Sequence, residues 1–160
     1  MKRRIPLASL MALALLLTAC VSDMPQPLGG LDRQLDQAGA GRAPSLSGRW
    51  LALIARRGER EVVLLVDGEQ GPLPLPGLNR PDAQPVSVAV EERGERLAVV
   101  RQLEGRTELV LYRRPFGIVQ RIAMQPPGVP RRVSLRADGR QLAVEVSRDG
   151  LWQVDLIDVP

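Results

Sequence analysis

The chain of 160 residues contains no histidine, a single cysteine and few aromatic side chains. Without imidazole, Ser-His-Asp nucleophiles, histidine acid-base catalysis and ordinary zinc sites are excluded. Two Trp, one Tyr and one Phe are too few to build a stacking platform for single-stranded nucleic acid. We therefore expect no metal, no cofactor and no nucleic-acid partner.

A strong charge of one sign is also missing once the N-terminus is set aside. The formal net charge is +4, but Lys2, Arg3 and Arg4 supply three of the 22 basic residues, which leaves 19 against 18 acidic ones. Three arginine pairs occur further along, at 56–57, 113–114 and 131–132. They could bind lipid headgroups or another acidic partner, since Arg forms bidentate bonds to phosphate and carboxylate. We favour solvated loops or protected strand edges.

The first 20 residues have the layout of an export signal. The basic start is followed by an uncharged apolar run from Leu7 to Leu17, which is too short to span a bilayer. Leu17, Thr18, Ala19 and Cys20 resemble the lipobox of bacterial lipoproteins. The resemblance implies diacylation of the Cys20 thiol, cleavage before it and N-acylation of the new terminus. We expect a signal peptide over residues 1–19; a free thiol, buried or paired between chains, is the alternative.

Acyl chains on Cys20 would hold the protein on a membrane surface without a spanning segment. We expect a place in the bacterial cell envelope, facing the periplasm, and the lack of Asp directly after Cys20 favours the outer membrane. Residues 20–42 are rich in Gly, Pro, Gln and Asp, with weak helical promise only over 30–40. They are predicted to form a flexible tether.

Beyond the tether, one unit recurs three times. Gly48, Gly94 and Gly139 precede similar apolar stretches and lie 46 and 45 residues apart. A second glycine follows each at a similar offset, and a strand-like run follows that: Glu61–Asp67 after Gly58, Glu108–Tyr112 after Gly105, and Leu151–Asp158 after Gly150. The period is typical of a propeller blade of four short antiparallel strands.

The third copy shows the pattern most clearly. The dipeptide Asp138-Gly139 suits a tight hairpin, and Gln141–Ser147 then places Leu142, Val144 and Val146 on one face of a strand. In the earlier copies, 51–55 and 97–100 are almost continuously apolar, which predicts strands covered on both sides. Trp50 and Trp152 fall on strands of different repeats, and we expect both to pack in the core.

Residues 134–143 fit the core pattern of the TolB-type, WD40-like propeller repeat, while 44–52 fit with one residue fewer and 88–94 depart further. The resemblance implies an all-β domain over 43–160, with blades of four-stranded antiparallel meanders at about 43–80, 85–125 and 131–160. Outer strands are expected at 72–76 and 118–124. Three units leave an open or partial propeller, and two chains could complete the six blades of the TolB type; an open sheet stack and a small barrel are alternatives.

The resemblance also implies contact with other envelope proteins. We predict a non-catalytic, lipid-anchored protein that binds an envelope protein or cell-wall partner through the turns of its repeats. A carboxylate-dependent hydrolase or lyase acting on envelope polysaccharide is the alternative, using Glu91 with Glu92 or Asp155 with Asp158. The candidate partner-binding residues lie in three turns: Arg56, Arg57, Arg106, Arg148 and Asp149.

Overall fold

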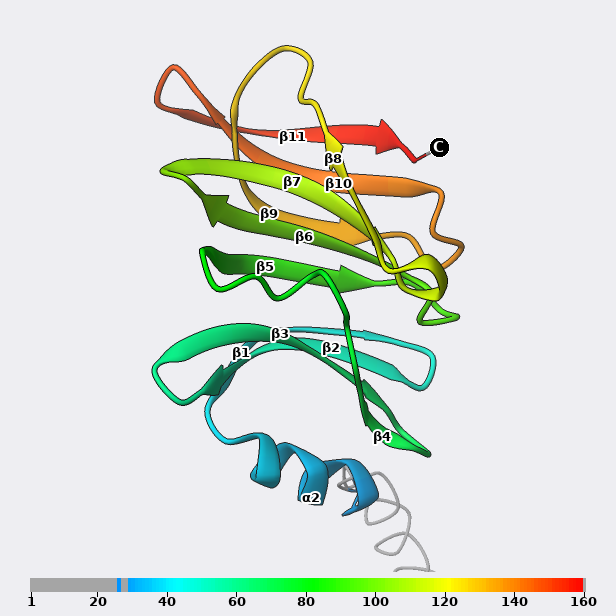
Figure 1. The fold of residues 1–160 in the computed structure, drawn as a ribbon. Helices are drawn as coiled ribbons and strands as arrows, with labels where there is room; N and C mark the ends of the chain where they lie inside the picture. Colours follow the sequence, from blue (N-terminus) through cyan, green and yellow to red (C-terminus); the bar gives the residue numbers. More distant parts are fainter. Residues whose placement is uncertain (1–25, 27–28, 160) are drawn as a thin grey trace, which may run out of the picture.

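The computed structural model describes residue 26 and residues 29–159, and it shows three antiparallel β-sheets with one helix (Figure 1). The all-β architecture predicted from the repeat is confirmed. Sheet A comprises β1 (Gly41–Ser47), β2 (Trp50–Arg57), β3 (Arg60–Asp67) and β4 (Gly71–Leu73). Sheet B comprises β5 (Ala83–Val90), β6 (Arg96–Leu103), β7 (Arg106–Arg113) and β8 (Ile118–Ile122), with the short helix η1 (Arg114–Phe116) before β8. Sheet C comprises β9 (Val129–Leu135), β10 (Gln141–Arg148) and β11 (Leu151–Asp158).

Each sequence repeat is one meander, because its strands pair in the order in which they occur. The matched glycines Gly48, Gly94 and Gly139 lie in the turns between the first and second strands, at φ of 56°, 66° and 71°. This left-handed backbone conformation costs glycine nothing, so the repeated glycine is the residue that the turn requires. The second set of glycines lies in the turns at the other end of each meander.

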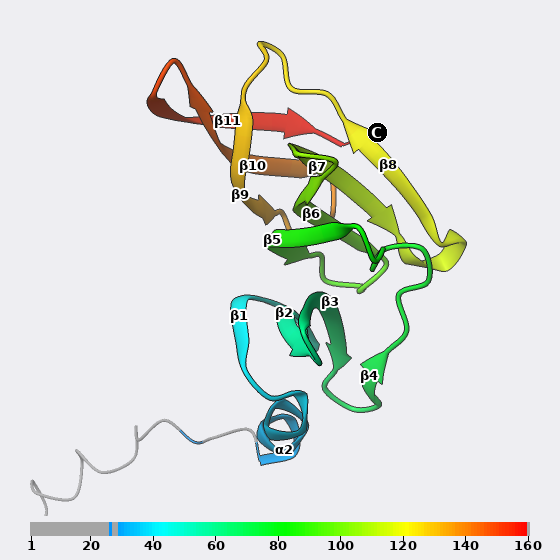
Figure 2. The same ribbon diagram turned by 60° about the vertical axis from the view of Figure 1, so that its left-hand side comes forward.

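Two apolar layers join the three sheets. One lies between sheets A and B and includes Trp50, Leu65 and Tyr112, and the other lies between sheets B and C and includes Leu109, Leu142 and Val144. Strands β2 and β6 are buried on both faces, as their continuous apolar runs predict. The sheets therefore form a stack, with sheet B in the middle (Figures 1 and 2).

Serine hydroxyls on the first strands also link neighbouring sheets. The Val90 N–H of β5 donates to Ser45 Oγ of β1, and the Val133 N–H of β9 donates to Ser87 Oγ of β5, both at 3.2 Å. The same kind of bond thus occurs at both junctions, although the two serines stand at different distances from the repeated glycine. Directional bonds of this kind fix how each sheet sits on the next.

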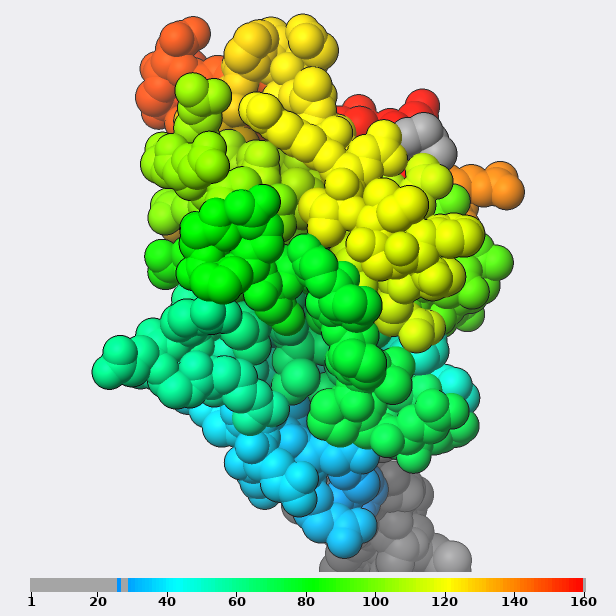
Figure 3. All heavy atoms as spheres, in the orientation of Figure 1, coloured from blue at the N-terminus to red at the C-terminus, as the bar shows by residue number. Residues whose placement is uncertain are grey.

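Helix α2 (Gly29–Ala38) covers the free face of sheet A. Its residues Leu31, Leu35 and Ala38, spaced by four and three, pack against Leu51, Leu53, Ala55, Leu64 and Val66 of β2 and β3. The space-filling view shows the helix seated directly on this sheet (Figure 3). The expectation of a flexible tether is therefore wrong for residues 29–38, because the exposed apolar face of sheet A gives a weakly helical segment a surface to bury.

Sheet C ends differently, because β11 has no further strand beside it among the described residues. The outer strands of the other two sheets lie where they were expected, although β4 is only three residues long and β8 ends at Ile122. Trp50 is 7% exposed, as predicted for the core, but Trp152 is 53% exposed on β11. The expected core position of Trp152 is wrong, since no other sheet or helix among the described residues covers that face of sheet C.

Candidate functional site

Three hairpin turns lie together at one end of the stack, on the left in Figure 1. They are Gly58-Glu59 between β2 and β3, Glu104-Gly105 between β6 and β7, and Asp149-Gly150 between β10 and β11. We call this surface the hairpin end. All the partner-binding residues expected from the sequence lie on it or beside it, because each repeat contributes the same turn in the same orientation.

The arginines of the first two turns are held loosely. Arg56 donates to the Gly58 carbonyl within its own turn at 3.2 Å, and Arg57 donates to the Gln37 carbonyl of α2 at 3.5 Å. Arg106 is exposed and makes no ion pair with any described residue. These guanidinium groups keep donors free for bidentate bonds to a carboxylate or phosphate of a partner.

Arg148 has a different role from the one predicted for it. Its guanidinium donates to both carboxylate oxygens of Asp155, at 2.9 and 2.5 Å, and to the Pro126 carbonyl at 2.8 Å. Its side chain is 10% exposed. The hydrogen bonds from Arg148 lower the pKa of Asp155 below its ordinary value of 3.8, against a smaller opposing effect of burial. Arg148 is therefore a positioning residue that holds the 126–127 loop on sheet C.

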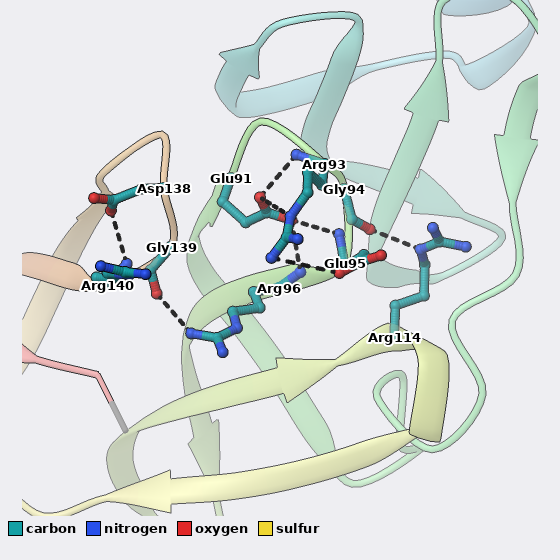
Figure 4. A network of polar contacts seen from close by, with 9 residues as sticks. All are labelled: Glu91, Arg93, Gly94, Glu95, Arg96, Arg114, Asp138, Gly139 and Arg140. Carbon is teal, nitrogen blue, oxygen red and sulfur yellow. Dashed lines mark hydrogen bonds and ion pairs between the residues drawn. The ribbon is translucent and has the colours of Figure 1, made fainter.

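A polar network occupies the opposite end, around the turn between β5 and β6 (Figure 4). The Glu91 carboxylate is 1% exposed and accepts the N–H groups of Arg93, Glu95 and Arg96, at 2.7, 2.6 and 3.2 Å. Arg96 then donates to the Gly139 carbonyl of sheet C at 3.0 Å. The network closes one turn and ties it to the neighbouring sheet, and it engages the Glu91 carboxylate with three backbone N–H groups of its own turn.

A groove of ≈ 750 Å³ between sheets B and C opens beside this network. Both acidic and basic side chains line it. Two of its carboxylates bind residues outside the lining: Asp138 pairs with Arg136 at 3.1 Å, and Asp158 accepts from Gln141 Nε2 at 3.0 Å. Of the acid pairs named for the enzyme alternative, Glu91 is committed to its turn and Asp155 to Arg148. The carboxylates left facing this groove, Glu92, Asp138 and Asp158, are the ones that the enzyme alternative would have to use.

The sequence reasoning missed an exposed apolar row on β11. Trp152, Val154 and Leu156 lie on the outer face of sheet C and are 53%, 70% and 80% exposed. Arg131 lies over the Trp152 ring, 5.0 Å from its centroid. A signal was present, because the residues paired with this row on β10 include Glu145 and Ser147, which do not suit a covered face.

The lipidation site lies outside the described residues, since Cys20 and residues 17–19 belong to the segment 1–25. Within residues 29–159 no helix is long and apolar enough to cross a membrane. The same residues contain no cluster of acidic side chains arranged to hold a metal ion.

Comparison with known proteins finds a similar fold among solved structures. No protein-family model matches the chain, and no curated protein matches it. Among solved structures, TolB from Acinetobacter baumannii superposes with a TM-score of 0.56 at 20% sequence identity, over 72% of this chain. The chain spans 29% of the length of that protein. The three stacked sheets are therefore similar to part of TolB.

Proposed function

We propose that this chain is a non-catalytic protein of the bacterial cell envelope, whose three sheets form a partial β-propeller that binds a protein or cell-wall partner. The observation that carries the proposal is the hairpin end, where three equivalent turns project from one rigid stack. Repeat scaffolds use such composite surfaces for recognition, since each repeat adds a loop at the same height. Arg56, Arg57 and Arg106 supply the charge there, and Asp149 adds a carboxylate on the third turn.

The proposed attachment is through acyl chains on Cys20, in a protein that faces the periplasm from the outer membrane. It is supported by the basic start, the apolar run and the Leu-Thr-Ala-Cys sequence. The likeness of the fold to TolB agrees with an envelope protein. Since α2 folds onto sheet A, the part of the tether left between Cys20 and the domain is short, and the domain would stay close to the membrane.

The expected ring of two chains stays a prediction, and two features count against it. It would place sheet C of one copy on the outer face of sheet A of the other, which α2 covers. It would also bury Glu145, at the centre of the outer face of sheet C. A ring therefore requires α2 to move away and the ion pair of Arg131 and Glu145, 4.0 Å apart, to be buried.

The enzyme alternative would use the groove between sheets B and C. Its test compares the cleavage of purified envelope polysaccharide, by hydrolysis or by elimination, between the wild-type chain and a variant carrying Glu92→Gln and Asp158→Asn. If the wild-type chain cleaves the polysaccharide and the variant stays folded but does not, the enzyme alternative replaces the binding proposal.

The anchor and the binding surface are tested in the same cells. We expect wild-type protein to stay in the membrane pellet after a high-salt wash and Cys20→Ser protein to be released; a variant that still pellets contradicts the anchor. For the surface, a photo-crosslinking residue at position 106 should trap a defined partner that one at Leu46, exposed on β1 away from the hairpin end, does not trap. Equal products from both positions contradict the hairpin end as the binding site.

A further inference from the structure

Strand β11 forms one edge of sheet C, and no described strand pairs with its outer side. It has eight residues, and all eight pair with β10 without a register shift. A regular edge strand presents a row of unpaired N–H and C=O groups, which is a template for another strand. Natural proteins protect such edges with proline, charge, bulges or short length.

Four of the other five edge strands contain a proline, whereas β8 and β11 have only charged side chains, Arg121 in β8 and Asp155 and Asp158 in β11. Three of the strands with a proline, β1, β5 and β9, also have a shift in register. The remaining one, β4, is only three residues long, and β8 has an arginine at an exposed position. The features are Pro44 in β1, Pro72 in β4, Pro85 in β5, Arg121 in β8 and Pro130 in β9.

The third strands of the other two sheets are also covered. Strand β7 is covered by β8 over five residue pairs. Strand β3 is covered by β4 and then by Asn79, whose side chain exchanges two hydrogen bonds with the backbone of Val63, at 2.8 and 2.9 Å. Among residues 29–159 the edges of β3 and β7 are thus covered, whereas no strand pairs with the equivalent edge of β11, and Ala123 and Gln125 of the loop before β9 line a groove beside it. We propose that β11 pairs antiparallel with β11 of a second copy of this chain.

The geometry of the β10–β11 hairpin determines which backbone N–H and C=O groups of β11 point away from β10. Asp149 and Gly150 form a two-residue turn with φ of 50° and 78°, closed by the pair Arg148 and Leu151. In such a hairpin the closing pair is hydrogen-bonded, and bonded and non-bonded pairs alternate from there. The residues whose N–H and C=O groups point away from β10 are therefore Trp152, Val154, Leu156 and Asp158.

A two-fold axis at Val154 makes this strand complementary to itself. Trp152 then pairs with Leu156 of the second copy, and Val154 pairs with Val154 of the second copy. Every outward-facing backbone group in this stretch meets another one, and the apolar rows of the two copies merge into one. Aromatic and β-branched neighbours of this kind stabilise cross-strand pairs. An interface around a two-fold axis needs this self-complementarity.

The polar side chains of β11 also find suitable neighbours in this register. On the other face, Gln153 comes opposite Asp155 of the second copy, so that an amide N–H meets a carboxylate. At the strand ends, the exposed Asp158 of the second copy approaches the turn end of β11, where Arg131 lies over Trp152. The register therefore avoids like charges in direct opposition and brings opposite charges together.

The test uses the full chain carrying Cys20→Ser, so that any introduced cysteine is the sole thiol and the result is independent of the lipid anchor. Light scattering should give the mass of a dimer at high protein concentration. Under mild oxidation Val154→Cys should form a disulfide dimer several-fold more than the matched control Leu46→Cys on exposed β1. The two Cα atoms of a hydrogen-bonded pair lie about 5.5 Å apart, within the range that a disulfide bridges.

A second pair of variants separates edge pairing from other contacts. Val154→Pro removes an N–H that points away from β10, so it should leave the fold intact and give a monomer, whereas Val154→Thr should stay dimeric. A wild-type monomer at high concentration overturns the proposal. A dimer that survives Val154→Pro and gives no disulfide at position 154 also overturns it and points to the ring of two chains.

Discussion

Gly94, in the turn between β5 and β6, lies against the indole ring of Trp50 in sheet A, so that a Cβ at this position would collide with the ring. Arg114 contacts both residues, since it donates to the Gly94 carbonyl at 2.7 Å and lies 5.3 Å from the Trp50 ring centroid. The repeated glycine thus serves two purposes here: it shapes its own turn and it lets the neighbouring sheet approach.

Replacing Gly94 with Ala should therefore destabilise the protein more than the same change at a glycine that only shapes a turn. We expect Gly94→Ala to lower the free energy of unfolding by about 3 kcal/mol, from strain at positive φ and from overpacking. Gly105 has a similar φ of 75° and open space around it, so Gly105→Ala is the matched control and should cost about 1 kcal/mol. Urea unfolding measures both; equal losses would show that the contact with Trp50 has no energetic weight.

Helix α2 should contribute to stability through the half-buried Leu35. We expect Leu35→Ala to lower the free energy of unfolding by about 1 kcal/mol, because it removes part of the cover over Leu53 and Leu64. Gln37 on the exposed side of the helix is the control, and Gln37→Ala should change stability by less than about 0.5 kcal/mol. If Leu35→Ala is as harmless as Gln37→Ala, residues 29–38 behave as the tether that the sequence suggested.

The pair of Arg148 and Asp155 should make stability depend on acid. Because folding lowers the pKa of Asp155, its contribution is present above its ordinary value of 3.8 and is lost as the pH falls through the lower folded value. Asp155→Asn should therefore weaken the wild-type loss of stability between about pH 5 and pH 2 while lowering stability at neutral pH. Chemical denaturation over this pH range measures the difference; parallel curves for the two proteins would contradict it.

Arg148 and Arg106 should respond differently to truncation, although the sequence suggested the same role for both. Arg148→Ala should lower Tm by several degrees, because the hydrogen bonds from Arg148 to the Pro126 and Pro127 carbonyls and to the Asp155 carboxylate are lost together. Arg106→Ala should leave Tm unchanged and weaken only the capture of a partner. Thermal unfolding of the two variants side by side tests this, and a large loss of Tm in Arg106→Ala would make it a structural residue too.

The sequence predicts the strands well where local rules determine them. The spacing of Gly48, Gly94 and Gly139 marks the three turns, and the alternation of Leu142, Val144 and Val146 gives the buried face of β10. Both signals are local, because a turn needs positive φ and a strand alternates its faces with period two. The sequence could not show what covers each face. Trp152 looks like a core residue by its pattern, and only the end of the stack leaves it exposed.

Helix α2 and the role of Arg148 were missed for a related reason. Two leucines over ten residues are too weak a signal for a helix without knowledge of the apolar face of sheet A. Arg148 stands at a hairpin turn, where arginine is usually solvated, and its partners Pro126 and Asp155 come from a loop and a strand that only the fold brings together. Such long-range contacts have no signature in spacing.

The proposed binding surface requires that the three repeats fold as one stack, and residue-resolved amide hydrogen exchange tests this most directly. The amides that exchange most slowly should lie in β2, β6 and β10, each the second strand of its sheet along the chain. They should exchange with similar free energies of opening. Fast exchange throughout β9, β10 and β11, with protection only in sheets A and B, would contradict the stack and with it the hairpin end that the proposed function requires.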